Sequence, residues 1–123
     1  MANTLIGVLN QTAKARLDPL DYNIETPSDR TYYISINTPI GYDIENITTK
    51  TLSGTCTCDF RINNVSIGGC GAIAVTGTRA VTTCTTPKTW PVGGILSVTV
   101  SSSSTPDMLA ISFALRRNGV EGF

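Results

Sequence analysis

Apolar residues recur at every second position in two runs near the C-terminal end of the chain. They are Leu96, Val98 and Val100 in the first run, and Leu109, Ile111, Phe113 and Leu115 in the second. A period of two places each set on one face of a strand. Residues 101–107 between the runs are polar and contain Pro106, so we expect a loop there. The pattern predicts an antiparallel hairpin whose apolar face must be covered by a second sheet.

Further short strands are expected upstream, separated by turn residues. Their ranges are 31–37, 43–51, 54–62, 65–67, 72–76 and 79–85. Ile44 and Ile47 are out of strict alternation, which indicates a bulge or an edge position. Asn63 and Asn64 are typical of a tight turn, because asparagine tolerates positive φ. Strands of this length and spacing predict an all-β fold, either an antiparallel β-sandwich or a jelly-roll-like small barrel, in one domain over residues 31–123.

The first 30 residues hold short apolar groups that follow neither period for long. We expect either an edge strand followed by a loop, or an extended N-terminal arm that becomes ordered on a neighbouring subunit. In the arm interpretation, the candidate partner-binding residues are Leu5, Ile6, Val8, Leu9, Lys14 and Arg16.

The 123-residue chain carries nine basic and nine acidic side chains, so its formal net charge is zero. A neutral chain lacks the field that draws a protein to nucleic acid or to anionic lipid, and we expect neither as a partner. A neutral polar surface instead suits a protein that packs against neighbours. The apolar residues of the first segment precede its basic ones, and no apolar run is long enough to cross a bilayer. We therefore expect synthesis in a cytoplasm, without a signal peptide.

The chain contains no histidine. Catalytic pairs that need an imidazole base, and metal sites built on histidine, are therefore excluded within it. The carboxylates are scattered singly, and no two are spaced as an acid and a base. We expect a protein that is not an enzyme and that binds no cofactor or metal.

Four cysteines, at positions 56, 58, 70 and 84, leave three interpretations open. We favour buried free thiols, the usual state of cysteine in a chain made in a reducing compartment. A disulfide, for instance between Cys70 and Cys84, is conceivable in a particle that matures outside the cell. A zinc site is a weak match, because Cys56 and Cys58 lie on one strand face rather than in a Cys-x(2–4)-Cys knuckle.

Trp90 lies in a stretch framed by prolines and glycines. Its ring can either close the end of a sandwich core or stack on a sugar ring or a protein partner. We favour the first interpretation and retain Trp90 as a candidate partner-binding residue under the second.

Four segments resemble small all-β virion proteins of tailed bacteriophages. They are Thr55-Cys56-Thr57-Cys58, Ile62-Asn63-Asn64-Val65, Val92-Gly93-Gly94-Ile95-Leu96 and Thr105-Pro106-Asp107-Met108-Leu109, within residues 53–116. The resemblance lies in residue type and order, and the four cysteines depart from the valine or threonine usual at such positions. It implies a structural protein of the virion, either a capsid decoration (cement) protein or a tail-fibre or baseplate module.

The first role fits a chain of this size better, since fibres usually carry long shafts. The resemblance thus implies a homo-oligomer (dimer or trimer) that binds the major capsid protein of the same virus and stabilises the outer shell through many copies of an ordinary interface. The alternative that it implies is a tail-fibre or baseplate-associated receptor-binding module whose loops, including Trp90, contact host surface glycan.

Overall fold

The computed structural model describes residues 17–118, which form eight β-strands and no helix. In chain order the strands are β1 (Leu17–Ile24), β2 (Arg30–Ser35), β3 (Tyr42–Ile62), β4 (Val65–Ser66), β5 (Ile73–Val75), β6 (Ala80–Thr83), β7 (Thr89–Trp90) and β8 (Leu96–Arg117). All the pairings among these strands are antiparallel. The predicted all-β antiparallel class is confirmed.

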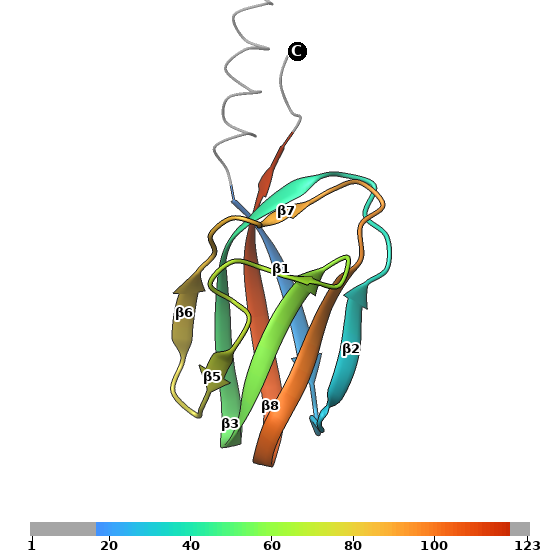
Figure 1. Cartoon of the computed structure of the whole chain (residues 1–123). Helices are drawn as coiled ribbons and strands as arrows, with labels where there is room; N and C mark the ends of the chain where they lie inside the picture. Colours follow the sequence, from blue (N-terminus) through green and yellow to red (C-terminus); the bar gives the residue numbers. More distant parts are fainter. Residues whose placement is uncertain (1–16, 119–123) are drawn as a thin grey trace, which may run out of the picture.

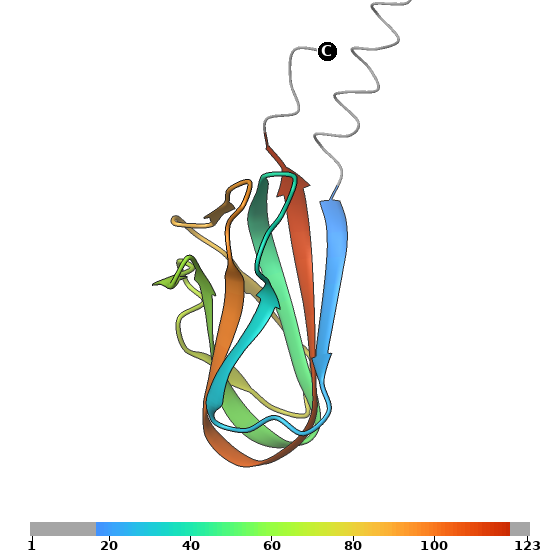
Figure 2. The same cartoon turned by 90° about the vertical axis from the view of Figure 1, so that its right-hand side faces the viewer.

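The framework consists of β3 and β8, which have 21 and 22 residues. They pair with each other along their whole length, from Tyr42 opposite Arg117 to Ile62 opposite Leu96. Both strands fold over at the lower end of the molecule in Figure 1, so each contributes one half to each of two facing layers. Figure 2 shows the two layers edge-on.

Each layer is completed by short strands at its margins. One layer contains β1, the second half of β8 and the first half of β3, with β6 and β7 on the far side of β3. The other contains β2, the first half of β8 and the second half of β3, with β4 and β5 beyond it. The chain is therefore an antiparallel β-sandwich of jelly-roll-like form, made from one continuous sheet folded onto itself.

The predicted terminal hairpin is wrong. The runs 96–100 and 109–115 belong to the single strand β8, and both pair with β3 rather than with each other. Between them the chain bends instead of closing a loop, with Ser102, Thr105 and Met108 at φ values of 49°, 44° and 51°. In the same way, the two strands predicted over 43–51 and 54–62 are the two halves of β3. Alternation identifies the faces of a strand but not the strand with which it pairs.

The bend of β3 lies beside that of β8. The register between the two strands shifts from Ser53 to Thr57, and Gly54 there has a φ of 74°. The connection from β1 to β2 crosses between the layers at the same end. Its Asp29 carboxylate accepts a hydrogen bond of 3.0 Å from the N–H of Ser103, and its Glu25 carbonyl accepts one of 2.8 Å from the N–H of Met108.

The alternating apolar positions form the core, as predicted. Every apolar residue of the two C-terminal runs is buried, and so are the apolar residues of β3 at 56, 58, 60 and 62. Phe60 from one layer and Phe113 from the other meet edge to face, with ring centroids 5.6 Å apart and an interplanar angle of 88°. This contact joins the two layers at the centre of the sandwich.

Two smaller predictions are also confirmed. The register of β3 against β8 shifts between Ile44 and Asn46, which is the expected bulge. Asn63 and Asn64, at φ values of 49° and 67°, form the tight turn between β3 and β4.

Part of the segment 1–30 belongs to the sandwich. Residues 17–24 form β1, which pairs with β8 at the edge of its layer, as in the edge-strand interpretation. The candidate residues of the arm interpretation, Leu5, Ile6, Val8, Leu9, Lys14 and Arg16, lie outside the described residues, and their role stays a prediction.

Candidate functional site

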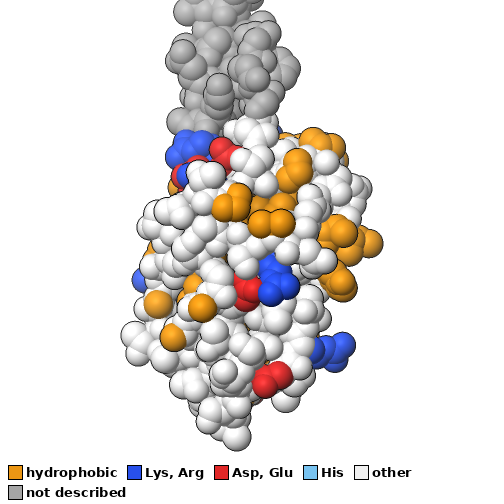
Figure 3. Space-filling view, viewed as in Figure 1, with side chains coloured by type: hydrophobic (Ala, Val, Ile, Leu, Met, Phe, Trp, Pro, Cys, Tyr) orange, Lys and Arg blue, Asp and Glu red, His pale blue; other side chains and the backbone are white. Residues whose placement is uncertain are grey.

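Exposed apolar side chains gather at the end of the sandwich opposite the bend. We call Tyr33, Val65, Val92 and Ile95 the end patch; they are 61%, 57%, 68% and 37% exposed. Figure 3 shows hydrophobic side chains collected on the upper part of this face, around β4 and β7 and along the margin formed by β2. An exposed apolar surface contributed by residues far apart in the sequence is typical of a contact site for another protein.

The end patch is continuous across the Asn63-Asn64 turn. Tyr33 and Ile95 line a shallow hollow of about 230 Å³ together with this turn. Val65 lines a second hollow, of about 270 Å³, which also includes Asn63 and is flanked by two prolines of the neighbouring segments. Because Asn63 belongs to both hollows, Tyr33, Ile95 and Val65 border one surface. Val92 directly follows Pro91, which lines the second hollow.

Backbone hydrogen bonds hold this surface in place. Asn63 and Ile95 are joined twice, through the N–H of Asn63 to the carbonyl of Ile95 at 2.8 Å and through the N–H of Ile95 to Oδ1 of Asn63 at 2.9 Å. The N–H of Gly93 donates to the carbonyl of Thr38 at 2.8 Å, which ties the loop carrying Val92 to the segment that follows β2. The end patch is thus largely preformed, which lowers the entropy lost on binding.

Trp90 lies beneath this surface and is not part of it. Its side chain is 3% exposed, its ring packs at 5.8 Å from that of Tyr42, and its Nε1 donates to the carbonyl of Gly94 at 2.9 Å. This is the core-closing role of the two proposed for Trp90. Trp90 is therefore not a partner-binding residue, which corrects the second interpretation. Its ring is buried and its N–H is already paired, so neither is available for contact with a sugar or a protein partner.

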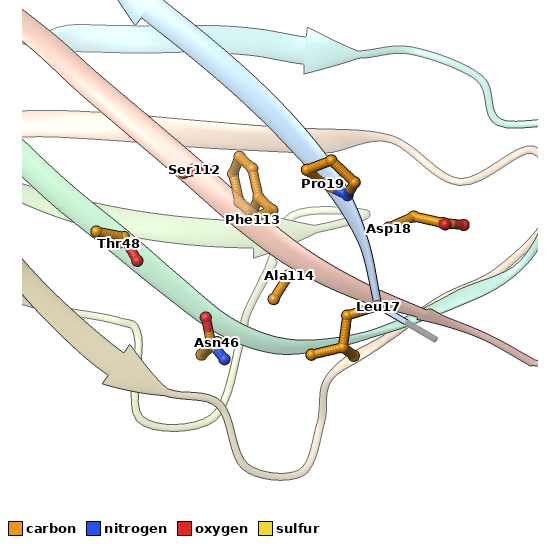
Figure 4. Close-up of a pocket in the computed structure, with 8 residues that line it drawn as sticks. All are labelled: Leu17, Asp18, Pro19, Asn46, Thr48, Ser112, Phe113 and Ala114. Carbon is orange, nitrogen blue, oxygen red and sulfur yellow. The ribbon is translucent and has the colours of Figure 1, made fainter. Parts of the chain in front are cut away.

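A second surface feature is a groove on the outer face of the layer that contains β1. Figure 4 shows its upper part, where Ala114 and Ser112 of β8 lie between Pro19 of β1 and Asn46 and Thr48 of β3. Two adjoining hollows of about 200 and 290 Å³ share Thr48 and Ser112, so the groove runs along β8. It exists because β8 presents only small residues outward here, while longer side chains stand on either side.

The groove is polar at its rim. Asp21 accepts a hydrogen bond of 2.5 Å from the hydroxyl of Ser112, and Asn23 stands beside it on β1. Lys50 and Arg79 line the opposite side, where the ammonium group of Lys50 donates to the carbonyl of Thr51 at 3.2 Å. A carboxylate, an amide and two cations around a shallow floor suit a ligand rich in hydroxyl groups.

The four cysteines are all buried and free, as favoured from the sequence. Cys70 and Cys84 stand out because their sulfur atoms are only 3.3 Å apart. The hydrogen bond between the two thiols, together with burial, raises the pKa of Cys84, and accepting that bond lowers the pKa of Cys70. Burial likewise raises the pKa of the Cys56 and Cys58 thiols, so these sulfurs are held as neutral, unreactive groups.

Residues 17–118 contain neither a cluster of metal ligands nor a helix able to cross a membrane. No group of three or more potential metal ligands converges among these residues. Within the same range, no helix has the length and hydropathy needed to cross a membrane.

The end patch was not predicted from the sequence. Val65 follows directly on a turn, and Val92 and Ile95 flank Gly93-Gly94, so their apolar character in turn regions was the available signal. Nothing in the sequence placed Tyr33 beside them, because that depends on the register of β2 against β8.

No family model and no curated protein matches this chain. Solved structures similar to it include an IMPa metallopeptidase in complex with T-antigen, at 10% identity and a TM-score of 0.45, with 87% of this chain and 14% of that protein covered. The N-terminal cellulose-binding domain of Cellulomonas fimi β-1,4-glucanase C is 13% identical, with a TM-score of 0.39 and coverages of 87% and 84%. The CBM36-1 domain of a multidomain xylanase, from the hindgut metagenome of Trinervitermes trinervoides, is 10% identical, with a TM-score of 0.35 and coverages of 89% and 77%. These likenesses assign no activity to the chain.

Proposed function

We propose that this chain is a non-enzymatic structural protein of a virion that decorates the outer shell of a tailed-phage capsid. Its partner is the major capsid protein of the same virus, and its contact surface is the end patch. The observation that carries the proposal is the preformed apolar surface of Tyr33, Val65, Val92 and Ile95 on a chain whose net charge is zero.

An apolar contact of this kind gains affinity from burial rather than from charge. Burying one valine contributes about 1.5–3 kcal/mol, so replacing it with a charged residue weakens binding by at least roughly tenfold. Oligomerisation as a dimer or trimer multiplies each contact and lets a modest interface hold a shell together.

Quantitative mass spectrometry of density-purified particles tests the proposal. We expect copy numbers equal to, or a simple fraction of, those of the most abundant shell protein. Val65→Lys and Val92→Lys should lower the copy number at least tenfold, whereas Leu52→Lys, an equally exposed apolar position at the opposite end, should not. Thermal unfolding of each purified variant controls for folding.

Three results would contradict the proposal in different ways. A handful of copies per particle would place the chain in the tail, and absence from particles would remove it from the virion. A normal copy number for both valine variants would show that the shell contact lies elsewhere on the chain.

The groove favours a second candidate function, a tail-fibre or baseplate-associated module that contacts host surface glycan. The contact would be made by Asp21, Lys50 and Arg79 in place of the buried Trp90. Asp21→Ala and Arg79→Ala should then slow adsorption of particles to host cells at least tenfold, and Arg30→Ala, which removes a cation from another face, should not. Unchanged adsorption in both groove variants would rule this candidate out.

A further inference from the structure

Cys70 and Cys84 are two thiols in direct contact, and the proposed function does not use their chemistry. Their Sγ atoms are 3.3 Å apart, and both residues are buried, at 0% and 3% exposed. A disulfide has a sulfur–sulfur distance of about 2.05 Å. The two sulfurs therefore need to approach by little more than an ångström, a distance that small side-chain rotations supply.

The backbone around the pair is already fixed in a paired arrangement. The segments that carry the two cysteines run antiparallel, with an isolated bridge between Gly68 and Thr85. The N–H of Thr85 donates to the carbonyl of Gly68 at 2.9 Å, and the N–H of Gly68 donates to the carbonyl of Pro87 at 2.9 Å. A side chain on Gly68 would collide with the Thr85 and Thr86 carbonyls at 2.5 Å, so the segments approach as closely as their backbones allow.

We propose that Cys70 and Cys84 form a disulfide when the folded protein meets a thiol-oxidising environment. The pair is a covalent modification site that cross-links the β4–β5 segment to the end of β6. It is independent of the proposed function, since any compartment change from reducing to oxidising would bring it about.

The reaction balances with a small-molecule disulfide such as oxidised glutathione as the oxidant. The thiolate of one cysteine attacks a sulfur of the oxidant, which forms a mixed disulfide and releases one glutathione thiolate. The second protein thiol then loses its proton and displaces the other glutathione. Two protein S–H bonds and one S–S bond are broken, one protein S–S bond and two glutathione S–H bonds form, and the two electrons go to the oxidant.

Burial sets the rate and the specificity of this step. Buried thiols are inert until the surrounding segments open, so oxidation of the folded protein is slow. Once a mixed disulfide has formed on either sulfur, the other lies beside it and closes the bond before a second oxidant molecule arrives. Cys56 and Cys58 are equally buried, and they serve as the internal control for exposure.

Tryptic peptide mapping resolves the pairing, because the four cysteines fall into three peptides. Residues 51–61 contain Cys56 and Cys58, residues 62–79 contain Cys70, and residues 80–88 contain Cys84. The full-length protein is incubated with oxidised glutathione, unfolded in the presence of an alkylating agent, and digested without reduction. We expect peptides 62–79 and 80–88 to be joined, with the loss of two hydrogens, while 51–61 carries two alkyl groups.

Thermal unfolding supplies a second measurement. A cross-link between residues 14 positions apart restricts the unfolded chain and should raise Tm by roughly 10 °C in the oxidised form. Reductant should remove the rise. Cys70→Ser should show no difference between the two conditions, and Cys56→Ser should keep the full difference.

Either of two results overturns the proposal. One is that peptides 62–79 and 80–88 remain separate and fully alkylated after an incubation with oxidised glutathione that is longer than the time the native fold needs to open. The other is a linked product that contains peptide 51–61. Because the mapping uses the wild-type chain, a variant that fails to fold leaves this conclusion intact.

Discussion

Replacement of Gly54 by alanine tests whether the sandwich depends on the tight bend of β3. Gly54 has a φ of 74°, a region that costs an L-residue about 1–2 kcal/mol. An added Cβ would lie 2.5 Å from the carbonyl carbon of Thr105 and 2.7 Å from Cα of Pro106, and it would also collide with the Thr105 carbonyl oxygen. These are backbone atoms of the β8 bend, so no side-chain rotation relieves the contact.

The two costs add up to a large share of the stability. Overpacking against backbone costs about 1–3 kcal/mol, so Gly54→Ala should destabilise the protein by about 2–5 kcal/mol in total. A domain of this size has a free energy of unfolding of about 5–15 kcal/mol. With a urea slope of about 1–3 kcal/mol per M, the midpoint of urea unfolding should fall by at least about 0.7 M.

Gly77→Ala is the matched control. A Cβ at Gly77 would have its nearest neighbour, the Thr51 carbonyl oxygen, at an ordinary 3.9 Å. This variant should be neutral or up to about 1 kcal/mol more stable, since alanine restricts the unfolded chain. If Gly54→Ala unfolds at the same urea concentration as Gly77→Ala, the bend does not need a left-handed residue at this position and the reasoning fails.

Three further predictions concern the core, and each uses urea unfolding in the presence of reductant. Phe113→Ala removes one ring of the interlayer pair and should lower the free energy of unfolding by about 3–5 kcal/mol, whereas Phe113→Leu should cost less than half as much. The hydroxyl of Thr49 is buried with no hydrogen-bond partner among the described residues, so Thr49→Val should raise stability by about 1 kcal/mol; a loss would mean that the hydroxyl is paired. Burial raises the pKa of Cys58, so the unfolded chain releases this proton at a lower pH than the folded chain does. Stability should be constant below about pH 8 and fall above about pH 9, and Cys58 should contribute up to about 1.4 kcal/mol per pH unit to a fall that it shares with Cys56 and Cys84, whose pKa values are also raised. Cys58→Ala should lose part of that fall, and an unchanged slope would contradict the assignment.

The faces of the strands could be predicted from the sequence because burial enforces a period of two. Leu109, Ile111, Phe113 and Leu115 are all buried, as the alternation requires. The Asn63-Asn64 turn could also be predicted from the sequence, since few residues tolerate positive φ. Both are local patterns, which can be interpreted without knowing which strand pairs with which.

The connection of the strands could not be predicted in the same way. Residues 101–107 contain serine, threonine, proline and aspartate, a composition that suits a hairpin loop and an edge-to-edge bend equally well. The choice between them is made by β3, whose own bend at Gly54 keeps it paired with β8 on both sides of the turn. The two bends are about 50 residues apart in the sequence, and neither segment alone contains a pattern that indicates their pairing.

The candidate surfaces were also only partly predictable from the sequence. Small outward residues on β8 follow from the alternation, but the groove appears only when β1 and β3 are placed on either side of β8. The ion pair between Arg117 and Asp18, at 2.8 Å, likewise joins the two ends of the described chain. The sequence around either residue gives no indication of its partner. Register, rather than composition, creates these sites.

The position of the cysteine pair links the two proposals in a testable way. Val65 stands on the same short segment as Cys70, and the segment after Cys84 lies against it through the hydrogen bonds of Gly68. This margin of the sandwich is attached to β3 by ladders of two to four residue pairs and by single backbone hydrogen bonds, such as that from the N–H of Cys84 to the carbonyl of Glu45 at 2.9 Å. Short ladders open more readily than the long ladder between β3 and β8. A disulfide there would hold the end patch in its binding form and reduce the ordering cost of docking. Shell affinity should therefore be higher for the oxidised protein than for the reduced protein, and Cys84→Ser should remove the difference while Cys56→Ser keeps it. Equal affinity in both redox states, with the cross-link demonstrated by peptide mapping, would show that the end patch is rigid without it.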